Sequence, residues 1–212
     1  MKKHFVLGGL LFVFLCLFSS SAFAQADKTG MIARGGIEIP IYAAASVSIG
    51  NTGQSTDVGA LFAVGPGLDL AFGYRWLYFG ILIEQQIGVV MATDDSLPAK
   101  WKDGEPVIIK KGDPSFLGAT YVLFEEYIPI NPEWLITVGE GLGASYGSGK
   151  NKLYVTSTDA AFAFKGEIGL SYFLFKKHGL GINFEFAGSM AIDDGISMSW
   201  TYNPMITYTI VL

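Results

Sequence analysis

In several segments of this 212-residue sequence, charged residues lie at positions that alternate with apolar ones. They lie opposite aliphatic and aromatic residues in an alternating pattern. Because successive side chains of a β-strand point to opposite faces, the charges of one segment share one face. We predict that this face lines the interior of a barrel and that its charged residues are Arg34, Glu38, Asp69, Arg75, Glu84, Glu125, Glu140, Lys165, Glu167 and Glu185.

These charges predict ionic chemistry inside the barrel. A charge in a narrow, poorly hydrated space is costly unless it is paired and hydrogen-bonded. We therefore expect a salt-bridge network in which Arg34, Arg75 and Lys165 are shared among several carboxylates. The carboxylates outnumber the cations, so an ion path or a proton-sensitive gate is the alternative.

The sequence does not predict a catalytic arrangement. A Ser/His/acid triad needs a histidine, and after residue 24 the sequence has one, His178, in a short turn. Glu125 and Glu126 are adjacent, so a strand points them to opposite faces and they form no catalytic pair. We predict no enzymatic activity, no cofactor and no metal site.

The elements that position these residues are long alternating strands. From 197 to 212 every second residue is large and apolar, and sixteen residues at about 3.3 Å each span roughly 50 Å. Such a strand suits a tilted bilayer crossing. Clear or weaker alternation marks seven more segments, at 31–40, 68–75, 79–91, 116–127, 134–146, 162–174 and 180–187.

The connections between these segments alternate in length. Short ones lie at 75–77, 130–133 and 176–179, and long polar ones at 48–57, 93–114 and 147–159, with a tighter one at 193–195. Outer-membrane barrels have short turns at one end and long loops at the other. The sequence therefore predicts an all-β, antiparallel up-and-down transmembrane β-barrel of eight strands. Ten strands is the alternative if part of 93–114 forms a hairpin.

Alternation alone also fits a soluble periplasmic ligand-binding barrel, whose apolar face points inward. The apolar rows here are too bulky for an eight-stranded interior, which side chains only just fill. The opposite faces are rich in Gly, Ala, Ser and Thr. Aromatic residues recur at strand ends, where a bilayer interface favours them, namely Tyr74, Trp76, Tyr78, Tyr127, Trp134, Tyr172, Trp200, Tyr202 and Tyr208.

Composition and the N-terminus agree with export. Half of the residues are hydrophobic and the mean hydropathy is +0.40, yet no apolar run approaches the roughly 20 residues of a transmembrane helix. Residues 1–24 read as a signal peptide, with Lys2 and Lys3 before an apolar run and Ala24 at a small-residue cleavage site. We predict one barrel domain at 25–212, without the sole cysteine, Cys16. A net charge of −5 excludes a basic nucleic-acid footprint.

The chain resembles the superfamily of small eight-stranded outer-membrane barrels that includes outer-membrane proteins A, X and W. The resemblance covers residues 25–212 and is architectural. It implies a monomer in the lipid of a Gram-negative outer membrane, delivered by periplasmic chaperones. The C-terminal strand is similar to the signal that the barrel-assembly machinery reads, here Tyr208, Ile210 and Leu212, although that group usually ends in Phe or Trp.

The predicted role is structural or a surface interaction through the long loops. Loops carry recognition in this architecture, and in 93–114 a tryptophan, Trp101, stands between Lys100 and Lys102. This loop is the candidate site for a surface ligand. The alternative function is a narrow pore or a conduit for small apolar ligands, as proposed for protein W-like barrels.

Overall fold

A computed structural model describes residues 29–49, 56–95, 99–100, 106–107, 110–149, 161–174, 177–192 and 195–212. The predicted signal peptide and the connection at 193–194 lie outside these residues. The strands are β1 (Gly30–Glu38), β2 (Ile41–Ile49), β3 (Thr56–Val64), β4 (Gly67–Arg75), β5 (Phe79–Ala92), β6 (Ala99–Lys100), β7 (Pro106–Val107), β8 (Pro114–Pro129), β9 (Trp134–Gly149), β10 (Ala161–Leu174), β11 (His178–Ile192) and β12 (Gly195–Val211).

No helix in the described part of the chain is long and apolar enough to cross a membrane.

Two of the crossings consist of two strands each. β1 and β2 are separated at Ile39–Pro40, and β3 and β4 at Gly65–Pro66, because proline has no N–H for the ladder. The hydrogen bonding nevertheless continues, since Gly65 N donates to Pro40 O at 3.3 Å. The first two predicted strands are therefore longer than the alternation at 31–40 and 68–75 indicated.

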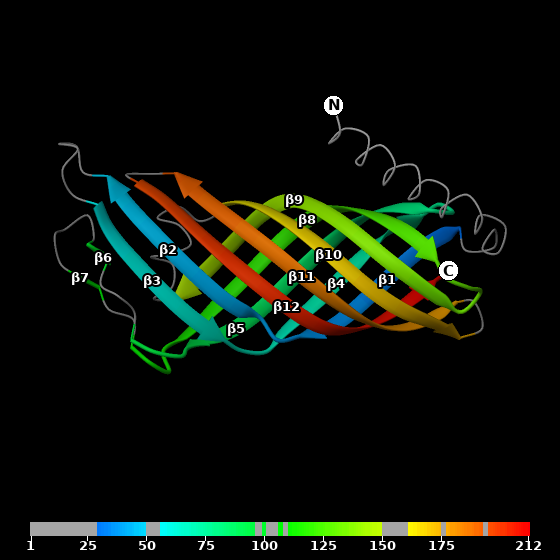
Figure 1. Cartoon of the computed structure of the whole chain (residues 1–212), viewed down its shortest axis with the longest axis horizontal. Helices are drawn as coiled ribbons and strands as arrows, with labels where there is room; N and C mark the ends of the chain where they lie inside the picture. The colour runs from blue at the N-terminus through cyan, green and yellow to red at the C-terminus, as the bar shows by residue number, and fades with distance from the viewer. Residues whose placement is uncertain are drawn as a thin grey trace, which may run out of the picture.

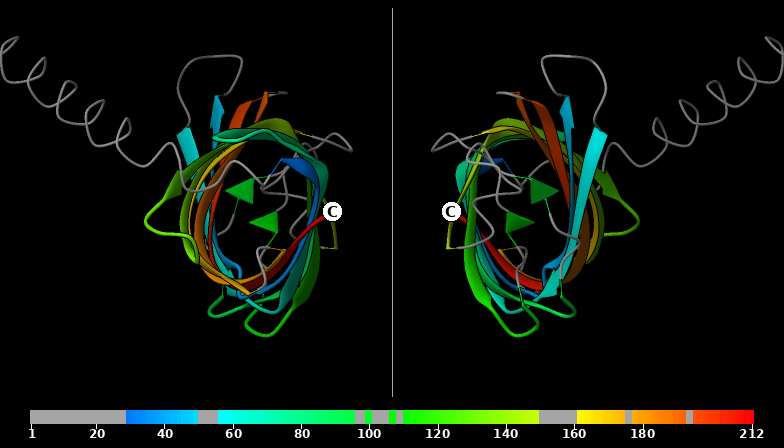
Figure 2. Two further views of the ribbon diagram at one scale, coloured as in Figure 1. Left: turned by 90° about the vertical axis from the view of Figure 1, so that its right-hand side faces the viewer. Right: turned by 90° about the vertical axis from the view of Figure 1, so that its left-hand side faces the viewer.

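The sheet closes into a barrel of eight crossings. β1 pairs with β12 as well as β4, and β5 pairs with β8, all antiparallel. Figure 1 shows the tilted strands from the side and Figure 2 shows the closed ring from its ends. β6 and β7 pair with each other in a separate sheet. Eight strands is confirmed, and the ten-stranded alternative is wrong because this loop hairpin does not enter the barrel.

The two ends of the barrel differ in their connections. We call "turn end" the end with the connections at 76–78, 130–133 and 175–177, and "loop end" the opposite end. In Figure 1 the turn end lies beside the label C, and β6 and β7 lie at the loop end.

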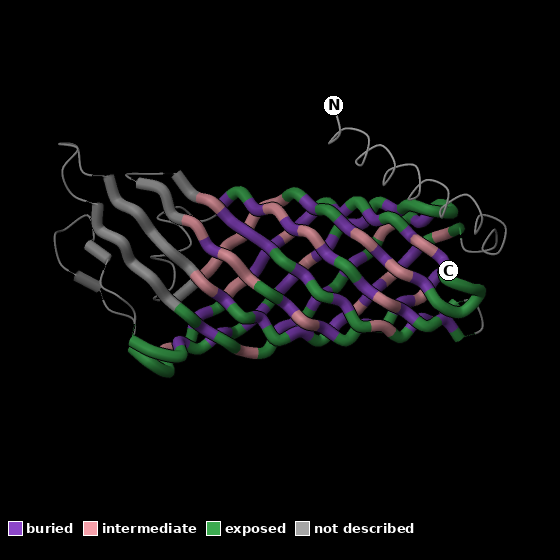
Figure 3. Tube along the Cα trace, viewed as in Figure 1, coloured by how far each residue is buried: buried purple, intermediate pink, exposed green. Residues whose placement is uncertain are grey.

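Exposure alternates along most of the described length of the barrel strands, and the outer face is apolar (Figure 3). On β4, Leu68 and Leu70 are 53% and 55% exposed, whereas Asp69 between them is 0% exposed. A soluble barrel would have the reverse polarity. The outer face therefore fits hydrocarbon, as in transmembrane barrels, and the soluble alternative is wrong.

Aromatic residues cluster on the outer face at the turn end. Trp76 stacks on Phe79 with ring centroids 5.0 Å apart, and Trp134 contacts Tyr172 at 5.1 Å. Of the other predicted interfacial aromatics, Tyr74, Tyr78, Tyr202 and Tyr208 are exposed and Trp200 is half-buried against Phe186.

Tyr127 is a correction to the predicted aromatic set. Its side chain is buried inside the barrel, 3% exposed. The reason is the period of the strand: Tyr127 is two residues after Glu125, so the two side chains share the inner face.

Candidate functional site

Apolar side chains fill the barrel interior at the turn end. This buried cluster, which we call the apolar layer, consists of Ile32, Ala71, Leu82, Leu123, Tyr127, Leu135, Phe173 and Val211. A gap of about 10 Å³ separates it from the charges above and has room for about one water molecule. The apolar layer therefore closes the lumen at this end.

Arg34 on β1 is the centre of a charged layer next to the apolar layer. Its Nη1 donates to Glu125 Oε1 at 2.5 Å and to Glu167 Oε1 at 2.8 Å, and its Nη2 donates to Glu84 Oε2 at 2.7 Å. Its Nε lies 3.7 Å from Asp69 Oδ1. One guanidinium thus connects β1 with β4, β5, β8 and β10.

Lys165 on β10 is the second cation of the charged layer. Its Nζ lies 2.5 Å from Glu84 Oε1, 2.5 Å from Glu185 Oε2 and 3.0 Å from Glu167 Oε2. The side chains of all these partners are buried. Because Glu84 and Glu167 also bind Arg34, the two cations belong to one connected network that we call the charged layer, consisting of Arg34, Asp69, Glu84, Glu125, Lys165, Glu167 and Glu185.

Two uncharged side chains extend this layer. Gln86 Nε2 donates to Glu185 Oε2 at 2.5 Å, and Asn203 Nδ2 donates to Glu185 Oε1 at 2.8 Å. Sequence reasoning missed both because it followed formal charge. Their positions on the inner face of alternating strands were the signal that could have identified them.

Glycines on β9 provide the space for the long side chains of β10. A Cβ at Gly139 would lie 2.7 Å from Glu167 Cγ, and a Cβ at Gly141 would lie 2.8 Å from Lys165 Cγ. Contacts this short require a neighbour to move. The inner face of β9 is therefore necessarily small beside the charged layer.

Glu140 is a correction to the predicted interior charges. It lies between these two glycines and, with strand period two, points to the outer face, where it is exposed. The structure places the other nine predicted residues inside the barrel, buried. The sequence does not show which residues of β9 face inward, because glycines there replace the apolar residues that mark the outer face of the other strands.

Arg75 and Glu38 lie on either side of the charged layer. Arg75 is 0% exposed, and its guanidinium lies 4.1 Å from the centroid of the Tyr127 ring, a cation–π contact next to the apolar layer. The Tyr127 hydroxyl donates to Glu125. Glu38 is 2% exposed and borders a cavity toward the loop end.

The interior carboxylates outnumber the cations among the described residues. Glu38, Asp69, Glu84, Glu125, Glu167 and Glu185 face inward with Arg34, Arg75 and Lys165. If all were ionised, the interior would carry three more negative than positive charges. A buried excess of this kind is unfavourable in a low dielectric, so protons or cations must offset part of it.

A cavity of about 50 Å³ lies between the charged layer and the loop end. Its wall includes Tyr42, Tyr121, Gln86 and Asn203 together with small side chains such as Ala119. This half of the lumen is therefore less filled than the turn end. The charged layer therefore borders open volume on the side toward the loop end.

The remaining predicted features lie outside the lumen. His178 at the turn end has its Nδ1 2.6 Å from the Tyr208 hydroxyl, on the outer side of the wall. In the loop 93–114, the described residues include β6, β7 and a turn in which Lys111 N donates to Asp95 Oδ1 at 2.8 Å. The lysine–tryptophan motif at 101–102 lies outside the described residues.

No protein-family model and no curated protein matches this sequence. Solved structures do match in fold. The outer membrane protein OprG from Pseudomonas aeruginosa aligns with a TM-score of 0.54 at 12% identity, over 89% of this chain and 99% of OprG. Neisserial surface protein A aligns with a TM-score of 0.51 at 9% identity, over 84% of this chain and 97% of that protein.

The shared fold, the apolar outer face and the filled interior make this chain a small transmembrane β-barrel of the outer-membrane type. The predicted resemblance to small eight-stranded outer-membrane barrels is confirmed at the level of fold. The neighbours also support the predicted location in the outer membrane.

Proposed function

We propose that this protein is a non-enzymatic outer-membrane barrel with a closed, charged lumen, whose role is structural or a surface interaction through the loop-end segments. The supporting observation is the pair of layers across the interior. The apolar layer is built by side chains from seven of the eight crossings and the charged layer by side chains from six, with a gap of about 10 Å³ between the layers. A barrel so filled serves better as a rigid support than as a channel.

The proposal includes the path to the membrane. Residues 1–24 act as a signal peptide and 25–212 as the barrel domain, which the periplasmic chaperones and the barrel-assembly machinery insert as a monomer. Tyr208, on the outer face of β12, and Leu212, directly after β12, are exposed, so such machinery can contact them. Fractionation with a heat-shift gel tests this: we expect heat-modifiable migration in the outer-membrane fraction, and release with the periplasm would contradict it.

Conductance measurements test the closed lumen. Folded protein reconstituted in planar bilayers is expected to give no resolved single-channel steps, and Arg34→Gln, which keeps a polar side chain at the centre of the charged layer, is expected to remain silent. Steady steps in the wild type, altered by Arg34→Gln, would contradict the proposal and favour the narrow pore.

The small-ligand conduit has one supporting observation, the cavity at the loop end with Tyr42 and Tyr121 in its wall. A conduit needs this cavity to continue past the charged layer. Extraction of the purified barrel with organic solvent and mass spectrometry would reveal an apolar ligand, and a stoichiometric one would favour this second function.

A surface ligand of loop 93–114 is tested on whole cells. The triple substitution Lys100→Ser, Trp101→Ser, Lys102→Ser removes the candidate loop motif, whereas Lys177→Ser removes an exposed lysine at the turn end. Loss of an aromatic contact residue is expected to weaken glycan-array binding about tenfold or more. Equal binding by both variants would contradict a ligand at this loop.

A further inference from the structure

Asp69 is buried in the barrel interior without a hydrogen-bond partner. Its exposed fraction is 0%, and neither Oδ1 nor Oδ2 accepts a hydrogen bond. The Arg34 Nε at 3.7 Å forms an ion pair but is too distant for a hydrogen bond. A buried carboxylate in this condition is costly unless another group satisfies its oxygens.

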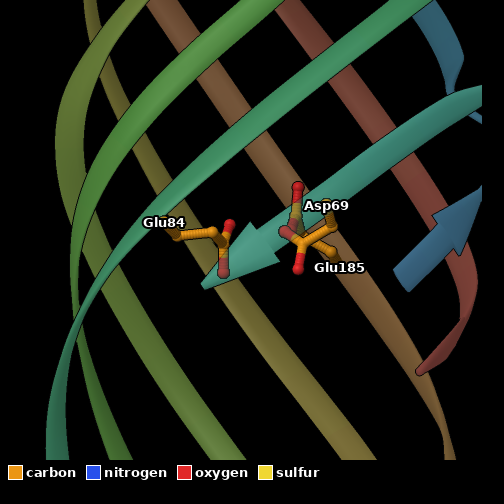
Figure 4. A group of neighbouring side chains, drawn as sticks. All are labelled: Asp69, Glu84 and Glu185. Carbon is orange, nitrogen blue, oxygen red and sulfur yellow. The ribbon is translucent and has the colours of Figure 1, made fainter. Parts of the chain in front are cut away.

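Asp69 faces two other buried carboxylates. One oxygen of each of Asp69, Glu84 and Glu185 lies within 4.8 Å of the other two, and Figure 4 shows the three side chains converging from β4, β5 and β11. Ca²⁺ binds oxygens at 2.3–2.6 Å, so two ligands on opposite sides of it are about 5 Å apart. Mg²⁺ usually keeps several waters and binds through one or two carboxylates, so a set of three carboxylates favours Ca²⁺.

We propose that these three carboxylates form a binding site for one divalent cation of the Ca²⁺ class inside the lumen. The charges fit. Lys165 contacts Glu84 and Glu185, and Arg34 contacts Glu84 and lies 3.7 Å from Asp69. The charged layer as a whole has five carboxylates and two cations, so the ionised layer has three excess negative charges, of which a divalent ion neutralises two.

The acceptor capacity of these oxygens is only partly used. A carboxylate has about four acceptor positions. Glu84 accepts from Lys165 and Arg34, and Asp69 accepts from none. Asn203, held to Glu185 by its Nδ2, leaves its buried Oδ1 without a partner. Oxygen ligands of this kind are those that Ca²⁺ prefers.

The ion reaches the site from the loop end. The cavity of about 50 Å³ is bordered by Glu38, Gln86 and Asn203, two of which donate to Glu185. Glu38 Oε2 is buried and has no hydrogen-bond partner, so it offers a carboxylate oxygen to a cation along this route. The apolar layer blocks the route from the turn end.

Calcium titration of the full folded barrel tests the site. Lipopolysaccharide-free protein in detergent is stripped with a chelator and titrated by calorimetry. We expect one Ca²⁺ per barrel with a dissociation constant of about 10⁻³ M or tighter, and a higher heat-shift temperature with calcium. Asp69→Asn, of equal size, is expected to weaken binding at least tenfold. Glu140→Gln, on the outer face, is expected to leave it unchanged.

Three results would overturn this inference: no binding up to about 10 mM calcium, ten times the weak end for protein sites; equal binding by wild type and Asp69→Asn; or loss of binding in Glu140→Gln. If Asp69→Asn does not fold, native mass spectrometry of the wild-type barrel decides, because one calcium adduct per barrel supports the site and none overturns it. A silent lumen in the bilayer experiment is compatible with either result, so this inference and the proposed function fail separately.

Discussion

Glu125 and Glu126 are neighbours in the sequence and lie in opposite environments. Glu125 is 1% exposed and binds Arg34 and Tyr127, whereas Glu126 is exposed on the outer face beside Phe79 of β5. A glutamate side chain is thus part of an ionic network on the inner face, and an identical one borders lipid-facing residues on the outer face. The comparison shows that strand phase, not residue type, determines what a charge does in this protein.

Gly141 on the inner face and Gly166 on the outer face also differ in the space around them. A Cβ at Gly141 would lie 2.8 Å from Lys165 Cγ, whereas a Cβ at Gly166 would have no neighbouring atom nearer than 4.0 Å. The inner face is crowded by a few long charged side chains. At Gly166 the outer face has free space for a larger side chain.

The largest expected effect comes from removing an inner cation. Lys165→Met removes the cation that contacts Glu185 and leaves Glu84 and Glu167 with Arg34, and breaking a buried ion pair costs about 3–5 kcal/mol. We expect a lower urea midpoint of unfolding by tryptophan fluorescence. Lys177→Met, exposed at the turn end, should unfold like the wild type. Equal midpoints for both variants would show that the inner network contributes little.

An intermediate effect is expected for the inner glycines. Gly141→Ala places a methyl group 2.8 Å from Lys165 Cγ, and overpacking typically costs about 1–3 kcal/mol. Gly166→Ala, on the outer face of the neighbouring strand, is the matched control and should be neutral. The same urea titration measures both, and similar losses in the two variants would contradict the difference between the faces.

The smallest effect is expected on the outer face, with the opposite sign. Glu140→Leu replaces an exposed carboxylate between Phe124 of β8 and Gly166 of β10 by an apolar side chain. The gain in unfolding free energy should be below the about 2–4 kcal/mol that a cation costs at the bilayer midplane. Stability is measured after folding into lipid vesicles. Destabilisation by Glu140→Leu would indicate that Glu140 has a partner of its own.

Much of the fold follows from local pattern. The alternation from 197 to 212 predicted a long strand with one apolar face, and β12 spans Gly195–Val211 with Tyr202 and Ile206 exposed and Asn203 and Thr207 buried. The aromatic type of Tyr127 predicts a place at the bilayer interface, whereas its spacing of two residues from Glu125 predicts the inner face, where the side chain lies. The prediction that Glu140 faces inward is wrong because Gly139 and Gly141 beside it give no apolar pattern from which the inner face of β9 could be identified.

The sequence by itself determined the class of this protein, since period two with bulky apolar residues on one face fits a barrel in a bilayer. It also determined most of the charged residues that face inward. Only the tertiary structure decided which charges meet, because Arg34 and Glu167 lie far apart along the chain and approach each other only across the closed lumen. Closure of the ring also decided that Asp69 has no donor of its own, since partners there come from the opposite wall and not from adjacent residues.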